Sequence, residues 1–327
     1  MQHIDCCPVC GVKPAFTVKK TVDLSTTAGI MHEQYAEYNL KLAGERKLSE
    51  HFAVCGSCAA VYRAFHFTEE EIRAIYTSLY LDFEDKFRNE IVYKNNDFLE
   101  GASARMFATI KWIEQGYQAP LHSVFDIGGR DGFRLKKLAA NGYVCTVYDP
   151  IALNPCHPDV HKRNIWSSQL RDDETADLIV SCNVLEHCTQ PRDMIRDSHQ
   201  HLNKDGFLFL VLPVDFESFL EWLMCYQFVG RPLNVDVTHH VFFSERAITG
   251  LLQAQGFDVK SIRYSHMPVY GGKEMEILAR KTTLSRAAVP PAARVPGSWN
   301  RFMFLSLLKV FPRIMQKIFK RLVRSAK

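Results

Sequence analysis

Four cysteines near the start of the sequence have the spacing of metal ligands. They form two Cys-x-x-Cys pairs, Cys7 with Cys10 and Cys55 with Cys58. Each pair can direct two thiolates at one ion from a tight turn, and two such turns close a four-cysteine site of the kind that binds structural zinc. The alternative interpretations are reduced structural cysteines or a redox pair. We predict bound Zn²⁺ that stabilises the fold and takes no part in chemistry, because four thiolates leave no position for water.

A second group of residues has the pattern of a nucleoside site. The stretch Val124-Phe-Asp-Ile127 has the composition of a short buried strand, and it leads into a turn that contains Gly128, Gly129 and Gly132. A glycine turn lets the backbone approach a ligand more closely than a side chain would permit. A second predicted strand ends at Asp149, 21 residues beyond Gly128. This spacing predicts a βαβ unit whose carboxylate binds the hydroxyls of an adenosine ribose.

The glycine pattern excludes NAD and resembles that of another family. Arg130 and Phe133 stand where a dinucleotide fingerprint needs its second and third glycines. The remaining Asp-x-Gly-x-x-x-Gly resembles the first motif of class I S-adenosylmethionine-dependent methyltransferases, although their usual middle glycine is Arg130 here. The resemblance covers residues 119–281. It continues, in the order of that family, through four further segments: 176–187, 202–212, 240–257 and the closing strands within 259–280.

The resemblance implies an α/β fold with a Rossmann-like sheet that is mostly parallel and has an antiparallel last strand. It also implies S-adenosylmethionine as cofactor, with Asp149 on the ribose and the glycine turn beside the methionine moiety. Asp126 is as suited to orienting the turn as to touching the cofactor. The cofactor-binding residues that we predict are Asp126, Gly128, Gly129, Gly132, Asp149, Asn183 and Val184. The alternative is a domain that has kept the scaffold and lost the cofactor.

Three histidines are candidates for a general base. Methyl transfer from a sulfonium requires an aligned acceptor, and a poorly acidic hydroxyl also requires a group that removes its proton. His187 follows Glu186 after the predicted fourth strand, and His239 and His240 precede the late helix. Both places lie near the cofactor mouth in the enzymes that the chain resembles. The alternative for each is a hydrogen-bonded structural histidine.

The acceptor is predicted from resemblance alone. A four-cysteine region ahead of a first motif that reads Gly-Gly-Arg-Asp-Gly is similar to sugar methyltransferases of deoxysugar and surface-glycan pathways. Carbon-methylating members carry an additional C-terminal domain, for which we expect no room after Arg280. We therefore expect O-methylation of a sugar or glycan intermediate. The alternatives are a lipid-linked or small aromatic acceptor, C-methylation of a nucleotide sugar, or an inactive interaction module.

Charge divides the chain into two parts. The 327 residues carry a net charge of +4, yet residues 281–327 contain eleven Lys or Arg and no Asp or Glu. The acidic remainder argues against nucleic acid as a partner. In residues 301–327, apolar residues recur at helical spacing between basic ones, which predicts a cationic amphipathic helix that binds an anionic membrane surface. A helix docked on the core or on a partner in a homodimer is the alternative.

These patterns predict five regions: a zinc-ribbon-like domain (1–68), a helical connector (69–118), a methyltransferase domain (119–281), a linker (282–300) and the basic amphipathic helix (301–327). The connector is expected to be helical because Met106, Ile110 and Ile113 form an apolar stripe at helical spacing. The start of the sequence has neither a basic nor an apolar signal region. We expect a cytoplasmic protein, with peripheral binding at the inner face of the membrane.

Overall fold

A computed structural model of the chain describes most of the region that carries the predicted motifs. The described residues are 2–23, 47–74, 96–150, 154–164, 174–214, 238–266 and 273–282. The predicted linker beyond residue 282 and the amphipathic helix of residues 301–327 lie outside them. No helix among the described residues is long and apolar enough to cross a membrane.

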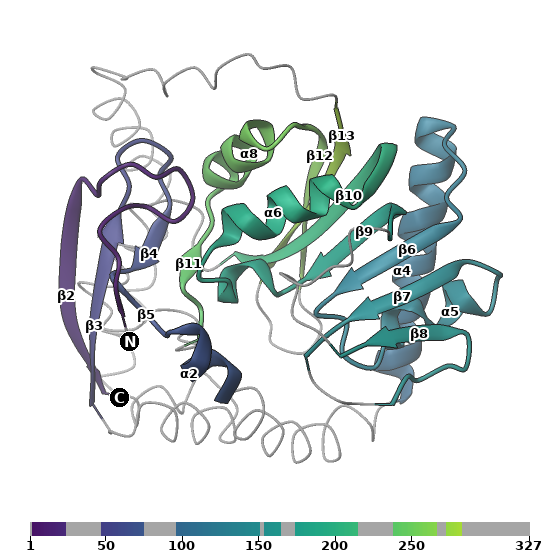
Figure 1. The fold of residues 1–327 in the computed structure, drawn as a ribbon, viewed down its shortest axis with the longest axis horizontal. Helices are drawn as coiled ribbons and strands as arrows, with labels where there is room; N and C mark the ends of the chain where they lie inside the picture. Colours follow the sequence, from purple (N-terminus) through teal and green to yellow (C-terminus); the bar gives the residue numbers. More distant parts are fainter. Residues whose placement is uncertain are drawn as a thin grey trace, which may run out of the picture.

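A seven-stranded sheet forms the centre of the molecule (Figure 1). β13 is antiparallel to both of its neighbours, and the other six strands share one direction. This arrangement confirms the predicted α/β fold with a mostly parallel sheet and an antiparallel last strand. In sheet order, the strands are β12 (Phe257–His266), β13 (Lys273–Lys281), β10 (Leu202–Val214), β9 (Ala176–Cys182), β6 (Ser123–Ile127), β7 (Val144–Tyr148) and β8 (Val160–Arg163).

Helices cover both faces of this sheet, which is why its central strands are almost continuously apolar. On one face, helix α4 (Asn96–Tyr117) and the short α5 (Lys136–Ala139) pack over β6, β7 and β9. The predicted stripe of α4 is buried there, since Met106 is 6% exposed and Ile110 and Ile113 are 0% exposed. The other face carries α6 (Pro191–Gln200) and α8 (Glu245–Ala254).

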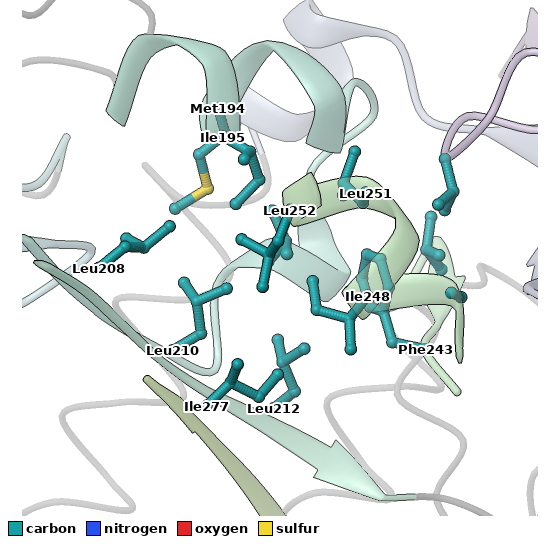
Figure 2. Packing of buried hydrophobic residues seen from close by; sticks show 14 of the residues in the cluster. Met194, Ile195, Leu208, Leu210, Leu212, Phe243, Ile248, Leu251, Leu252 and Ile277 are labelled. Carbon is teal, nitrogen blue, oxygen red and sulfur yellow. The ribbon is translucent and has the colours of Figure 1, made fainter. Parts of the chain in front are cut away.

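The α6 and α8 face has a well-packed apolar core (Figure 2). Ile248 and Leu252 of α8 meet Leu210 of β10 and Ile277 of β13, and all four are fully buried. Burying one such side chain contributes roughly 1.5–3 kcal/mol. Ser244 caps the start of α8, because its hydroxyl accepts a hydrogen bond from the backbone N–H of Ala247 at 3.1 Å.

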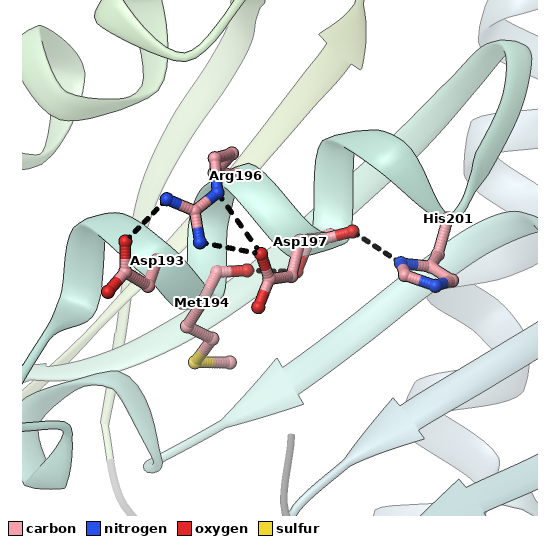
Figure 3. Close-up of polar contacts among 6 residues, drawn as sticks. Asp193, Met194, Arg196, Asp197 and His201 are labelled. Atoms are coloured by element: carbon pink, nitrogen blue, oxygen red, sulfur yellow. Dashed lines mark hydrogen bonds and ion pairs between the residues drawn. The ribbon is translucent and has the colours of Figure 1, made fainter. Parts of the chain in front are cut away.

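The outer surface of α6 is polar (Figure 3). Arg196 lies between two carboxylates, 2.7 Å from that of Asp193 and 3.1 Å from that of Asp197. At the end of the helix, Nδ1 of His201 lies 2.8 Å from the carbonyl oxygen of Asp197. These contacts fix the helix end from which the chain enters β10.

A smaller antiparallel sheet packs beside the α8 end of the large one (Figure 1). Its order is β11 (Val241–Phe242), β4 (Val61–Arg63), β3 (Lys47–Val54) and β2 (Phe16–Asp23). A short pair, β1 (Gln2–His3) with β5 (Phe65–His66), adjoins it, followed by helix α2 (Glu69–Ala74). β11 lies in the chain between β10 and β12 of the large sheet, and it pairs with β4 of the small sheet. The two sheets also share one continuous apolar core.

Candidate active site

The glycine turn lies at the carboxyl ends of the central parallel strands. β6 ends at Ile127, which pairs with Tyr148 of β7 and Ser181 of β9. The next residue, Gly128, has φ +70°, and a Cβ atom there would lie 2.4 Å from Cγ2 of Val184. Glycine is required at this position because Val184, in the loop after β9, fills the space of a side chain. Gly128 and Val184 were both predicted to bind the cofactor, and the structure places them together.

Arg130 occupies a position that is usually glycine in the first motif of the methyltransferases that the sequence resembles. Its φ is +61°, in the left-handed region that glycine adopts readily. Its backbone N–H donates to Oδ2 of Asp149 at 2.9 Å. The arginine therefore follows the backbone path of a glycine, at a cost of about 1–2 kcal/mol, and a hydrogen bond to the carboxylate offsets part of that cost.

Asp149 stands directly after β7, where the sequence predicts a carboxylate that binds ribose. It is 4% exposed, and its Oδ1 lies 4.0 Å from the ammonium nitrogen of Lys162 in β8. Burial lowers the pKa of Lys162. Nothing in the sequence pattern indicated Lys162, because β8 is short and lacks an apolar run. Asp149 thus lies beside the turn, as predicted, with a cation on its other side.

Asp126 is buried beneath the turn. It is 1% exposed, and neither carboxylate oxygen has a hydrogen-bond partner among the described residues. Burial raises its pKa from 3.8 to about 7. A Cβ atom on Gly129 would lie 2.4 Å from Oδ2 and 2.5 Å from Cγ of Asp126, so the Asp126 side chain fills the space that any residue larger than glycine would need. A buried carboxylate without a hydrogen-bond partner among the described residues suits a positively charged neighbour.

Asn183 and Gly132 complete the set of predicted cofactor residues. Asn183 follows β9 with φ +55°, and its side-chain amide donates to Oε1 of Glu274 in β13 at 3.2 Å. This hydrogen bond connects the loop after β9 to the antiparallel strand β13. Gly132 has φ +79°, and a Cβ there would lie 2.7 Å from Cγ1 of Val160. Gly132 therefore seats the turn against β8.

Two of the candidate bases meet at the same edge of the sheet. His187 ends the short helical turn η6 (Leu185–His187), and its ring meets that of His239 edge-on, with centroids 4.6 Å apart. One ring nitrogen of each histidine and one carboxylate oxygen of Glu186 all lie within 4.8 Å of one another. The hydroxyl of Thr238 lies 2.9 Å from Nδ1 of His187. Of the two histidines, His187 is the more exposed.

His240 has a different environment. It is 0% exposed, and its ring stacks on that of His66 with centroids 4.5 Å apart and planes inclined by 10°. Burial lowers the pKa of His240 well below its ordinary value and that of His66 to about 4. Both rings are therefore neutral near pH 7, and they form part of the boundary between the two sheets.

The four predicted metal ligands also lie together. The Sγ atoms of Cys7, Cys10, Cys55 and Cys58 are all within 4.8 Å of one another, and all four cysteines are free. Sγ of Cys10 lies 3.3 Å from that of Cys55, and Sγ of Cys7 lies 3.6 Å from that of Cys58. A tetrahedral zinc with bonds of about 2.3 Å needs sulfurs about 3.8 Å apart. The donor set and its spacing therefore fit one zinc ion.

Known proteins resemble this chain at low sequence identity. No curated protein matches the sequence. Three methyltransferases are among the solved structures that resemble the chain. A 1,6-didemethyltoxoflavin-N1-methyltransferase from Burkholderia thailandensis has a TM-score of 0.49 and 17% identity over 72% of this chain and 96% of its own. Magnesium protoporphyrin IX methyltransferase from Synechocystis PCC 6803 has a TM-score of 0.47 and 16% identity, over 66% and 100%. The N-methyltransferase NodS from Bradyrhizobium japonicum WM9 has a TM-score of 0.41 and 18% identity, over 58% and 99%.

A family model gives the assignment. The model described as a methyltransferase domain matches residues 65–262. This match begins before α4 and extends into β12, so it includes the glycine turn, Asp149 and the histidines after β9. It covers more than half of the 327 residues. The chain belongs to the methyltransferase domain family.

Proposed function

We propose that this protein is an S-adenosylmethionine-dependent methyltransferase that O-methylates a sugar or surface-glycan intermediate. The observation that supports the cofactor most strongly is the turn after β6. Arg130 adopts a glycine-like conformation there, and its N–H donates to the Asp149 carboxylate. The match to the methyltransferase domain supports the reaction class.

Each part of the site has a role in this proposal. The cofactor supplies a methyl group already activated on a sulfonium. Asp149 would bind the ribose. Asp126 would lie near the cationic end of the cofactor, whose charge would favour the ionised carboxylate that burial alone disfavours. Gly128 and Gly129 allow the backbone to approach. The site thereby holds the donor in place, and alignment of the acceptor provides most of the acceleration.

His187 is the group that we assign to proton removal from the acceptor hydroxyl. It is more exposed than His239, and His240 is fully buried against His66. Thr238 fixes one ring nitrogen of His187, while the other lies 3.9 Å from Oε1 of Glu186. In the tautomer whose Nδ1–H donates to the Thr238 hydroxyl, Nε2 carries the lone pair that takes up the proton of the acceptor hydroxyl, and the nearby Glu186 carboxylate stabilises the resulting imidazolium.

The acceptor is tested by mass spectrometry. The full chain is incubated with S-adenosylmethionine and with nucleotide sugars, glycan fragments, lipid-linked sugars or small phenols, and each product is examined for the gain of one CH₂. A gain on a sugar oxygen supports the proposal. A gain on carbon, on a phenol or exclusively on a lipid-linked acceptor assigns one of the alternatives instead.

The non-enzymatic alternative is an interaction module with an empty Rossmann-like domain. Calorimetric titration with S-adenosylmethionine distinguishes it, since an inactive module gives no binding heat. We also propose that the cysteine cluster binds structural zinc and that residues 301–327 bind an anionic membrane surface. Flotation with anionic vesicles, with and without residues 297–327, tests the latter. Equal flotation of both forms would contradict it.

A further inference from the structure

The segment that carries His239 and His240 is held by the N-terminal sheet. Directly after His240, β11 pairs with β4, with Val241 opposite Tyr62 and Phe242 opposite Val61. The two histidines therefore stand where the chain passes from the large sheet to the small one. The methyltransferase sheet alone does not determine their position.

Arg63, the last residue of β4, contacts both histidines through their backbone. Its N–H donates to the carbonyl oxygen of His240 at 2.9 Å, and its Nε donates to the carbonyl oxygen of His239 at 2.8 Å. Arg63 is 7% exposed, and its guanidinium lies over the rings of Phe52 at 5.2 Å and Phe242 at 6.0 Å. One buried residue thus fixes two consecutive carbonyl groups that lie more than 170 positions later in the sequence.

His239 and His240 also contact His187, the candidate base, and its neighbour Glu186. The backbone N–H of His240 donates to the carbonyl oxygen of Glu186 at 2.8 Å, and Glu186 immediately precedes His187 in η6. The His239 ring meets the His187 ring edge-on, with centroids 4.6 Å apart. A displacement of residues 239–240 would therefore move both neighbours of His187, namely the His239 ring and the Glu186 backbone.

The turn that contains Cys55 and Cys58 supports the strand that carries Arg63. The backbone N–H of Cys55 donates to the carbonyl oxygen of Ala60 at 2.9 Å, which closes the turn that leads into β4. Cys55 and Tyr62 belong to the same buried cluster as Val241 and Ile248. The apolar core therefore continues from the cysteines to the histidine segment without a break.

We propose that Arg63 is a positioning residue of the methyltransferase site, and that the N-terminal sheet is through it a part of the acceptor side of that site. The inference deepens the proposed function and rests on it. General-base catalysis depends on the placement of the base, and a displacement of about 1 Å can cost about 100-fold in rate. The Nε of Arg63 is the side-chain donor to the carbonyl oxygen of His239, and this is the hydrogen bond that a substitution of Arg63 removes.

The test compares the full chain with Arg63→Gln, Arg63→Lys and the control Arg105→Gln, which alters an exposed arginine of α4. Ring-¹⁵N spectra of the histidines, S-adenosylmethionine affinity and methyl-transfer rate are measured for each. We expect Arg63→Gln to shift the ring signals of His187 and His239, to leave those of the distant His122 unchanged and to lower the rate about 100-fold. The cofactor Kd should change by less than about twofold, because the glycine turn lies on other strands.

Arg63→Lys keeps the aliphatic stem and the charge but loses the planar Nε donor, so we expect a folded protein with a smaller shift of the same signals. Unchanged His187 and His239 signals and an unchanged rate in either folded variant would overturn the proposal. A measurement on the unsubstituted protein needs no variant: the backbone amides of Arg63 and His240 should be protected from hydrogen exchange. Rapid exchange at both amides would also overturn the inference.

The spectra separate this inference from the proposed function. If the unsubstituted protein binds no S-adenosylmethionine while Arg63→Gln still shifts the histidine signals, the proposed function fails and the positioning contact remains. If the cofactor binds and the signals do not move, the positioning role fails and the proposed function remains.

Discussion

Asp126→Asn should stabilise the protein at high pH and not at low pH. Asp126 is buried, and its pKa rises from 3.8 in an ordinary environment to about 7 because burial disfavours the charged carboxylate. A carboxyl with a raised pKa in the folded state costs stability as the pH rises from the unfolded to the folded pKa, here from about 4 to about 7. Asparagine has nearly the same shape and does not ionise.

The magnitude follows from the pKa of about 7. Between pH 5 and pH 7, each pH unit changes the free energy of unfolding of the unsubstituted protein by about 1.4 kcal/mol relative to the variant. The advantage of Asp126→Asn should therefore be about 3 kcal/mol larger at pH 8 than at pH 5. Any constant cost of burying the asparagine amide cancels in this difference.

Urea unfolding of the cofactor-free protein at pH 5 and pH 8 measures the effect. The control is Asp258→Asn on β12, whose side chain is 53% exposed; a surface change of this kind should alter stability by less than about 0.5 kcal/mol at either pH. An Asp126→Asn advantage that is equal at both pH values would refute the argument. It would show that the carboxylate is ionised in the folded protein at pH 5, with a partner that stabilises it.

Three further predictions concern the site and the cysteine cluster. Asp149→Ala should raise the Kd for S-adenosylmethionine by about 10- to 100-fold, the value of a hydrogen bond to a charged group, while the exposed Asp159→Ala should not; equal Kd values would place the ribose elsewhere. His187→Gln should lower the methyl-transfer rate by about 10²- to 10⁴-fold without changing cofactor affinity, and an unchanged rate would assign proton removal to another group. Cys58→Ser should lose the zinc measured by plasma mass spectrometry and unfold at a lower temperature, whereas the exposed Cys156→Ser should keep it; equal metal content would rule out the four-cysteine site.

The parts of the fold that have a strong local signal were predictable. β6, β9 and β10 are apolar because helices cover both of their faces, and α4 shows its buried stripe at helical spacing. The Cys-x-x-Cys pairs are close in space because each pair is already local in the sequence, so the fold has only to bring together two turns.

Contacts between distant short segments could not be predicted. β8 and β11 are too short for an alternating pattern to show, so the lysine beside Asp149 and the strand that joins the two sheets had no local signal. Arg63 meets residues 239–240 across the small sheet, and nothing in either segment indicates the other. The positive φ of Arg130 could not be predicted either, because an arginine in the sequence does not indicate a glycine-like backbone conformation.

The central claim is that the turn after β6 binds S-adenosylmethionine. Calorimetric titration of the full chain, of Gly128→Ala and of Gly142→Ala tests it most directly. Both glycines have positive φ, but a Cβ at Gly128 would clash with Val184, while one at Gly142 has no neighbour within 4 Å. We predict one equivalent of cofactor bound by the unsubstituted protein and by Gly142→Ala, and binding lost in Gly128→Ala. Absence of binding to the unsubstituted protein, or equal binding by all three, would contradict the account.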